Sequence, residues 1–189
     1  MTTIATSTER QLRSALARNL DAAFPDLVRE LQDGIYSGAL RLTGHRQDAE
    51  DVTQEAFIRA YRAMRGYDAE RIRQLRLRPW VWTIALNLCR NTARRKSRKP
   101  TQGLGRDRPD PERGPEETAV SLLATEEWNR RLDQLSTPQR SAVVLRHVAD
   151  LTYAEISEAT GRPIGTVKAD THRGIARLRA MTEEEGTRR

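Results

Sequence analysis

Cysteine and aromatic residues are scarce in this sequence, and their scarcity excludes several classes of protein. Cys89 is the only cysteine among 189 residues, so no internal disulfide can form and a reducing compartment is indicated. Cys89 and the three histidines have none of the spacings of a metal site, so we expect neither a metal nor another cofactor. The chain is 5% aromatic, 37% hydrophobic and 31% charged, which indicates small helical domains joined by polar segments.

Long apolar runs are also missing. The sequence has no run of about 18 apolar residues, which a transmembrane helix would require. Its first twenty residues lack the apolar segment of a secretory signal. The sequence therefore predicts a cytoplasmic protein without membrane insertion.

Basic residues are concentrated in one segment, Arg71–Lys99 (RIRQLRLRPWVWTIALNLCRNTARRKSRK). This segment holds ten Lys and Arg and no acidic residue. The rest of the chain has 23 basic and 26 acidic residues, so the segment alone gives the protein its net charge of +7. Clustered arginines of this kind are typical of a nucleic-acid interface, because they pair with phosphates.

From Trp80 onward, this segment has the period of an α-helix with two different faces. One face is apolar and carries Val81, Ile84, Ala85 and Leu88. The opposite face carries side chains suited to phosphates and base edges, namely Thr83, Asn87, Arg90, Asn91, Arg94 and Arg98. Trp80 lies at the margin of that face, where its ring could stack on an exposed base. Taken alone, the helix fits a solvated basic surface with a buried tryptophan equally well.

Two helices are predicted before the basic segment, after a polar and weakly helical stretch over residues 1–20. The first helix covers Phe24–Leu42, with Pro25 in its first turn and Gly44 just after its end. The second covers Asp48–Met64. The connection between Met64 and the basic helix, residues 65–79, has no clear period and is predicted to be a long loop.

Ile58 stands out on the second of these helices, because it lies in the middle of a charged face. The other residues on that face are Asp51, Gln54, Glu55 and Arg62. An exposed apolar side chain surrounded by charges indicates a protein–protein contact.

A Pro- and Gly-rich stretch, Ser97–Glu117, separates the basic segment from the C-terminal part and is predicted to be a linker. Thr137 is then predicted to be the N-cap of a helix that has Pro138 at its first position. Thr152 and Glu155 form a capping box that opens a short helix ending at Gly161. A last helix follows from Ile164, so the two final helices form a helix-turn-helix.

The last helix has the faces expected of a DNA-recognition helix. The residues predicted to be buried are Ile164, Val167, Thr171, Ile175 and Leu178. Those predicted to point outward are Thr166, Ala169, Asp170, Arg173 and Arg177, with Lys168 and His172 on the flank. We expect Asp170 to contribute least to DNA binding, because its charge repels phosphates.

Three motifs in this order resemble the extracytoplasmic-function (ECF) sigma factors of the bacterial sigma-70 family. They are AEDVTQEAFIRAY (Ala49–Tyr61), PWVWTIALNLCRNTARR (Pro79–Arg95) and LTYAEISEATGRPIGTVKADTHRGIARLR (Leu151–Arg179). The resemblance covers Phe24–Arg98 and Thr118–Arg179 and implies an all-α fold of two small helical domains. The implied organisation is an N-terminal extension (1–20), a sigma-2 domain (21–98), a linker (99–117), a sigma-4 domain (118–182) and a tail (183–189).

The resemblance also implies partners and site residues. Core RNA polymerase would be bound through its β′ clamp helices by Asp48, Asp51, Gln54, Glu55, Ile58 and Arg62, and through its β flap. The −10 promoter element would be bound by Trp80, Thr83, Asn87, Arg90, Asn91, Arg94 and Arg98. The −35 element would be bound by Thr166, Lys168, Ala169, His172, Arg173 and Arg177. Residues 65–79 would capture a flipped base, and an anti-sigma factor is a further possible partner.

Two other interpretations remain open at this point. The first is a helix-turn-helix transcription regulator that acts without being a polymerase subunit. The second is a recombinase or nuclease with a helix-turn-helix tail, which would need a Ser or Tyr nucleophile or a carboxylate cluster for two metals. The acidic residues of the second helix do not form such a cluster, because Glu50 and Asp51 point apart. We therefore expect no enzymatic activity.

Overall fold

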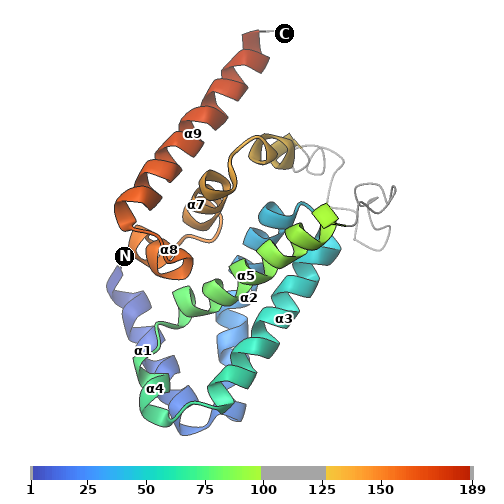
Figure 1. The fold of residues 1–189 in the computed structure, drawn as a ribbon. Coiled ribbons are helices and arrows are strands. Elements are labelled where there is room, and N and C mark those ends of the chain that lie inside the picture. Colours follow the sequence, from blue (N-terminus) through green and yellow to red (C-terminus); the bar gives the residue numbers. More distant parts are fainter. Residues whose placement is uncertain (1, 99–126, 188–189) are drawn as a thin grey trace, which may run out of the picture.

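The structure is a computed structural model that describes residues 2–98 and 127–187, and all regular elements in these ranges are α-helices (Figure 1). The first part contains α1 (Thr2–Arg18), α2 (Leu20–Thr43), α3 (Arg46–Arg65), α4 (Ala69–Gln74) and α5 (Leu77–Arg98). The second part has helical residues 127–133, followed by α7 (Thr137–His147), α8 (Tyr153–Thr160) and α9 (Ile164–Thr187). The predicted linker falls almost entirely outside the described residues.

Helix α2 begins earlier than its apolar pattern predicted. Asn19 accepts a hydrogen bond from the backbone amide of Ala22 at 3.1 Å and so caps the helix five residues before Phe24. Pro25 therefore lies inside the helix and not in its first turn. The predicted end is confirmed: Gly44 has a φ of 72° and donates its amide to the carbonyl of Leu40.

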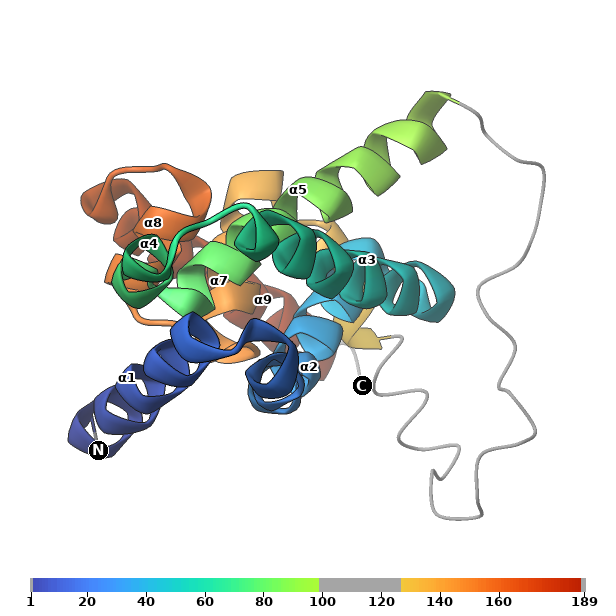
Figure 2. The ribbon, with the colours of Figure 1, turned by 90° about the horizontal axis from the view of Figure 1, so that it is seen from below.

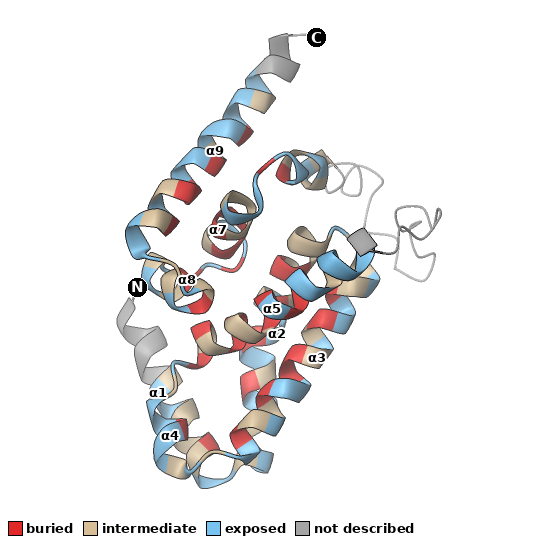
Figure 3. Ribbon diagram, viewed as in Figure 1, coloured by how far each residue is buried: buried red, intermediate tan, exposed pale blue. Residues whose placement is uncertain are grey.

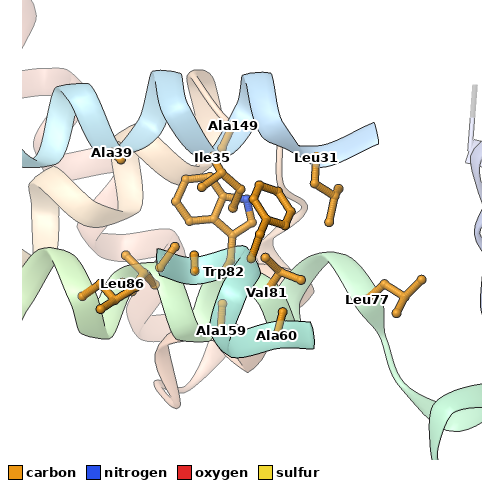
Figure 4. Packing of buried hydrophobic residues seen from close by; sticks show 14 of the residues in the cluster. Leu31, Ile35, Ala39, Ala60, Leu77, Val81, Trp82, Leu86, Ala149 and Ala159 are labelled. Carbon is orange, nitrogen blue, oxygen red and sulfur yellow. The ribbon is translucent and has the colours of Figure 1, made fainter. Parts of the chain in front are cut away.

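The core of the first part lies where α2, α3 and α5 face one another (Figures 3 and 4). Trp82 of α5 is only 1% exposed, and its ring lies against α2 beside Ile35 and Ala39 (Figure 4). Gly38 makes this approach possible, because a Cβ atom at that position would lie 2.3 Å from Cη2 of Trp82. α5 thus buries Trp82 and Leu86 in addition to the apolar face seen in the sequence.

The prediction that residues 1–20 are weakly helical is wrong. α1 is a continuous helix that packs against α4 and α2, and Leu16 on it is 1% exposed (Figures 1 and 2). The loop predicted over residues 65–79 is also shorter than expected. Asp68 accepts a hydrogen bond from the amide of Arg71 at 2.7 Å and starts the short helix α4.

The second part contains the predicted helix-turn-helix, α8 and α9. Thr152 and Glu155 form the expected capping box at the start of α8, and Gly161 ends the helix with a φ of 67°. α7 begins one residue earlier than predicted, because Ser136 is its N-cap. Gly174 of α9 is buried against α7, where an added Cβ would lie 2.6 Å from a methyl group of Val143.

The two parts are packed on each other, with α8 against α5 and α7 against α2 (Figures 1 and 2). The guanidinium of Arg78 on α5 donates to the carbonyl of Ala149 at 2.6 Å, and Arg76 pairs with Glu158 of α8. Ala149, Leu151 and Ala159 are buried in the same apolar cluster as the α5 side chains. Among the described residues, no helix is long and apolar enough to cross a membrane.

Candidate nucleic-acid interface

The polar stripe predicted on α5 is exposed in the structure. Asn87, Arg90, Asn91 and Arg94 are all exposed. Arg90 also lines a small pocket together with residues of the second part, among them Thr137 and Arg162. Arg90 donates to the amide oxygen of Asn87 at 3.2 Å, a bond that does not use the amide hydrogens of Asn87. Arg98 belongs to α5, but its side chain lies outside the described set.

Thr83 contributes less to this stripe than its position predicted. Its side chain is half-buried, and its hydroxyl donates to the carbonyl of Pro79 at 3.0 Å, one turn earlier in the same helix. The hydroxyl oxygen keeps its acceptor capacity, but its donor is already used.

Trp80 lies near Tyr67 at the start of α5. Its ring is half-buried, and its centroid is 6.2 Å from that of Tyr67, with the two rings tilted by 57°. The guanidinium of Arg71 on α4 lies 3.8 Å from the centre of the Tyr67 ring, close enough for a cation–π interaction. The sequence placed Trp80 at the interface but did not identify Tyr67, because the loop that carries Tyr67 has no period.

A second surface lies between α2 and α3, where an open groove has a volume of about 1120 Å³. Gln54, Ile58 and Arg62 of α3 line it, and the Ile58 side chain remains 38% exposed. α2 supplies the opposite wall, with the side chains of Phe24, Val28 and Tyr36. The sequence could not identify these groove residues, because their half-burial depends on how α2 and α3 are placed together.

The remaining acidic residues of the predicted α3 surface lie outside this groove. Asp48 pairs with Lys96 of α5, and its side chain is only 13% exposed. Glu55 accepts a hydrogen bond from Arg59 at 2.7 Å, and Asp51 accepts one from Gln47 at 3.4 Å. Asp48 therefore joins α3 to α5 instead of extending the exposed face.

On α9, the exposed residues form one face of the recognition helix, while two of the predicted residues are half-buried. The exposed residues are Lys168, His172, Arg173 and Arg177, and the half-buried ones are Thr166 and Ala169. Ile164 was predicted to be buried but is 45% exposed, because it lies in the first turn of α9, beyond the helices that cover Val167.

Asp170 was predicted to point outward, and this prediction is wrong. Its side chain is 7% exposed and pairs with Arg162 of the turn at 2.5 Å and with Arg173 of α9 at 2.7 Å. Burial alone raises the pKa of Asp170, but hydrogen bonds from the two guanidinium groups outweigh burial and leave its pKa below the usual value. Asp170 thus turns inward and holds Arg173 against the helix-turn-helix.

The described residues contain no group of three His, Cys, Asp or Glu side chains that could hold a metal ion. Cys89 is 7% exposed, and burial raises the pKa of its thiol to about 12.

Comparison with known proteins identifies the family of this chain. Residues 27–99 match the model of sigma-70 region 2, and residues 125–178 match that of sigma-70 region 4. The chain is 34% identical over 174 residues to the ECF RNA polymerase sigma factor SigW of Bacillus subtilis, covering 86% of this chain and 90% of that protein. It is 35% identical over 164 residues to the ECF RNA polymerase sigma factor SigE of Mycolicibacterium smegmatis, covering 84% of this chain but 62% of the relative.

A solved structure supports the same fold. It is that of the sigma factor RpoE of Bartonella quintana in complex with the anti-sigma factor NepR, with 21% identity and a TM-score of 0.65. The match covers 85% of this chain and 96% of RpoE. With both sigma-70 regions present in order and a helix-turn-helix in the second, the chain belongs to the ECF sigma factors of the sigma-70 family, the promoter-specificity subunits of RNA polymerase.

Proposed function

We propose that this sigma factor divides its two tasks between separate surfaces of its first part. The α2–α3 groove binds the clamp helices of the β′ subunit, and the exposed stripe of α5 binds the −10 element and holds its opened strand. The observation that carries this proposal is the exposure of Asn87, Arg90, Asn91 and Arg94. α5 is buried against α2, α3 and α8 and still keeps these four residues free of the core.

Each group on the stripe has a distinct part in this interface. The arginines pair with phosphates, which contributes affinity without sequence preference. Asn87 presents amide hydrogens to a base edge, and the Trp80 ring stacks on an unpaired base next to Tyr67. Extruding that base costs a few kcal/mol in lost stacking, which the contacts of the stripe offset.

The α2–α3 groove suits a helical partner with both apolar and charged side chains. Its walls combine apolar residues such as Phe24, Val28 and Ile58 with two acidic and two basic residues, namely Asp33, Glu50, Arg62 and Arg65. An amphipathic helix laid in such a groove buries its apolar face and places its charges at the rim. Asp48, Asp51 and Glu55 lie beyond the groove and would contribute at its margin.

The second part binds the −35 element through the exposed face of α9 and docks on the β flap. Arg173 and Arg177 bind the major groove, with Lys168 and His172 beside them, and Thr166 and Ala169 lie at the start of the same face. An anti-sigma factor would regulate the protein by covering the same groove and helices. The sigma factor performs no reaction of its own and works in the cytoplasm with the polymerase.

Paired substitutions test this division of tasks. Ile58→Glu is expected to weaken binding to core polymerase by about 30-fold, the effect of losing one strong interface contact, while the fold is retained. Asn87→Ala is expected to leave core binding unchanged and to slow promoter opening, followed with 2-aminopurine in the −10 element. Glu30→Ala is the control, because Glu30 is exposed on α2 outside the groove. Normal opening by the Asn87 variant would refute the assignment of the stripe.

The same assay separates this function from that of an independent regulator. Specific binding to promoter DNA is expected only when core polymerase is present. Specific binding by the isolated protein would favour the regulator instead.

A further inference from the structure

The N-terminal helix α1 lies outside the segment that matches sigma-70 region 2, which begins at residue 27. It nevertheless contacts both ends of the junction between α4 and α5. The Glu9 carboxylate accepts a hydrogen bond from the backbone amide of Leu77 at 3.0 Å, and the Arg13 guanidinium donates to the carbonyl of Leu75 at 3.3 Å. Both bonds are partly buried and link residues more than sixty positions apart in the sequence.

The bond from Leu77 to Glu9 replaces a cap that α5 lacks. Leu77 is the first residue of α5, and the residue before it is Arg76, whose side chain cannot accept a hydrogen bond. The first amides of a helix need an acceptor from elsewhere, and a carboxylate there also interacts favourably with the helix dipole. Glu9 of another helix meets both needs, so the start of α5 is held in place by α1.

Apolar packing fixes the same junction from inside. Leu16 of α1, Ile72 of α4 and Leu77 of α5 are 1%, 4% and 1% exposed and belong to one cluster. α4 lies beside α1 in both views of the ribbon (Figures 1 and 2). Tyr67 lies just before α4 and Arg71 lies within it, and α4 leads directly into this junction. The position of the Tyr67 ring near Trp80 therefore depends on where α1 holds residues 75–77.

We propose that α1 is a positioning element for base selection at the −10 element, a proposal that rests on the −10 function of α5 and its loop. Glu9 and Arg13 do not touch DNA. They hold the Leu75–Leu77 junction so that the Tyr67–Trp80 pair forms a pocket of fixed shape for one unpaired base. Releasing the junction widens that pocket and lowers its discrimination among bases.

The test uses holoenzyme assembled from core polymerase and full-length sigma variants. A pool of single-stranded oligonucleotides, randomised over the −10 positions, first gives the sequence that the wild-type holoenzyme prefers. Affinities are then measured for that sequence and for each single-base change. Glu9→Ala and Arg13→Ala remove the two contacts, Glu9→Gln keeps an acceptor oxygen, and Gln11→Ala is the matched control because Gln11 is exposed on α1.

We expect wild type, Gln11→Ala and Glu9→Gln to discriminate by about tenfold or more at the selected base, as one mismatched position typically costs. Glu9→Ala and Arg13→Ala are expected to discriminate by about threefold or less, with unchanged affinity for core polymerase. If the wild-type holoenzyme itself shows no base preference, the proposed −10 function fails. If the wild-type holoenzyme shows a base preference and both alanine variants discriminate as strongly as wild type, the positioning role of α1 is overturned.

Discussion

Two glycines of α2 are predicted to respond in opposite directions to the same substitution. Gly34 and Gly38 are one helical turn apart, and both lie inside the helix. A Cβ added at Gly34 meets no atom within 4 Å, whereas one added at Gly38 would lie 2.3, 3.1 and 3.3 Å from three ring carbons of Trp82. Gly34 is only half-buried, whereas Gly38 is buried against Trp82.

The expected magnitudes follow from two opposing effects. Replacing an interior helix glycine with alanine stabilises the helix by up to about 1 kcal/mol. Overpacking a well-filled core costs about 1–3 kcal/mol, and Trp82 cannot turn away because it is 1% exposed and enclosed by the core. Gly34→Ala should thus raise the free energy of unfolding by up to about 1 kcal/mol, while Gly38→Ala should lower it by as much as about 2 kcal/mol.

Differential scanning calorimetry of both variants and of wild type measures the effect. A difference of about 1–3 kcal/mol between the variants corresponds to roughly 2–12 °C in Tm for a chain of this size. Near-ultraviolet circular dichroism should show a changed tryptophan signal for Gly38→Ala and an unchanged one for Gly34→Ala. If Gly38→Ala proved as stable as Gly34→Ala, the packing of Trp82 against α2 would be refuted.

Three other predictions concern the second part and the contact between the parts. Asp170→Ala should destabilise the helix-turn-helix by about 2 kcal/mol, because charge-assisted hydrogen bonds from two arginines are lost. Since the folded-state pKa of Asp170 is lowered, its contribution is complete at neutral pH and is lost as the pH falls from about 4 towards that lower value. Urea titrations of Asp170→Asn between pH 3 and 7 should show less loss of stability in acid than wild type, and equal loss would contradict the assignment. The −10 and −35 elements lie about 85 Å apart at about 3.4 Å per base pair, so we expect the two packed parts to separate before both elements can be bound. Joining Arg76→Cys and Glu158→Cys with a short cleavable bismaleimide should therefore abolish promoter-dependent transcription. Reductive cleavage of the cross-link should restore transcription, and full activity of the joined protein would show that the parts need not separate. Finally, Cys89, with a pKa of about 12, should resist iodoacetamide at pH 8 until the protein is unfolded in urea, and mass spectrometry showing rapid native labelling would contradict its burial.

The helices that the sequence predicted most accurately are those in which a local signal and a long apolar period agree. In α8, Thr152, Glu155 and Gly161 act within the same few residues, and the structure keeps all three roles. The predicted start of α2 was too late, because Asn19, a strong cap, precedes the first residues of the apolar pattern. Local hydrogen bonds of this kind need no distant partner, which explains why they can be found in a sequence.

Predictions failed at residues whose environment helical period does not describe. α1 is polar overall, and Leu16 is buried only because α4 and α2 lie beside it. Asp170 was placed on the outer face by helical period alone, yet Arg162 of the preceding turn and Arg173 of the same helix draw its carboxylate inward. The pairing of Asp48 with Lys96 of another helix likewise could not be read from the sequence.

The sequence by itself determined the all-α class, the helix-turn-helix and the exposed Asn and Arg stripe of α5, and its three motifs determined the resemblance to the family. The first three features follow from periodicity, capping and composition, all of which act along the chain. Only the tertiary structure decided that α2 and α3 enclose a groove at Ile58, that α8 rests on α5 and that Glu9 caps Leu77. Such contacts depend on which helix faces are brought together, and period and composition do not specify that pairing.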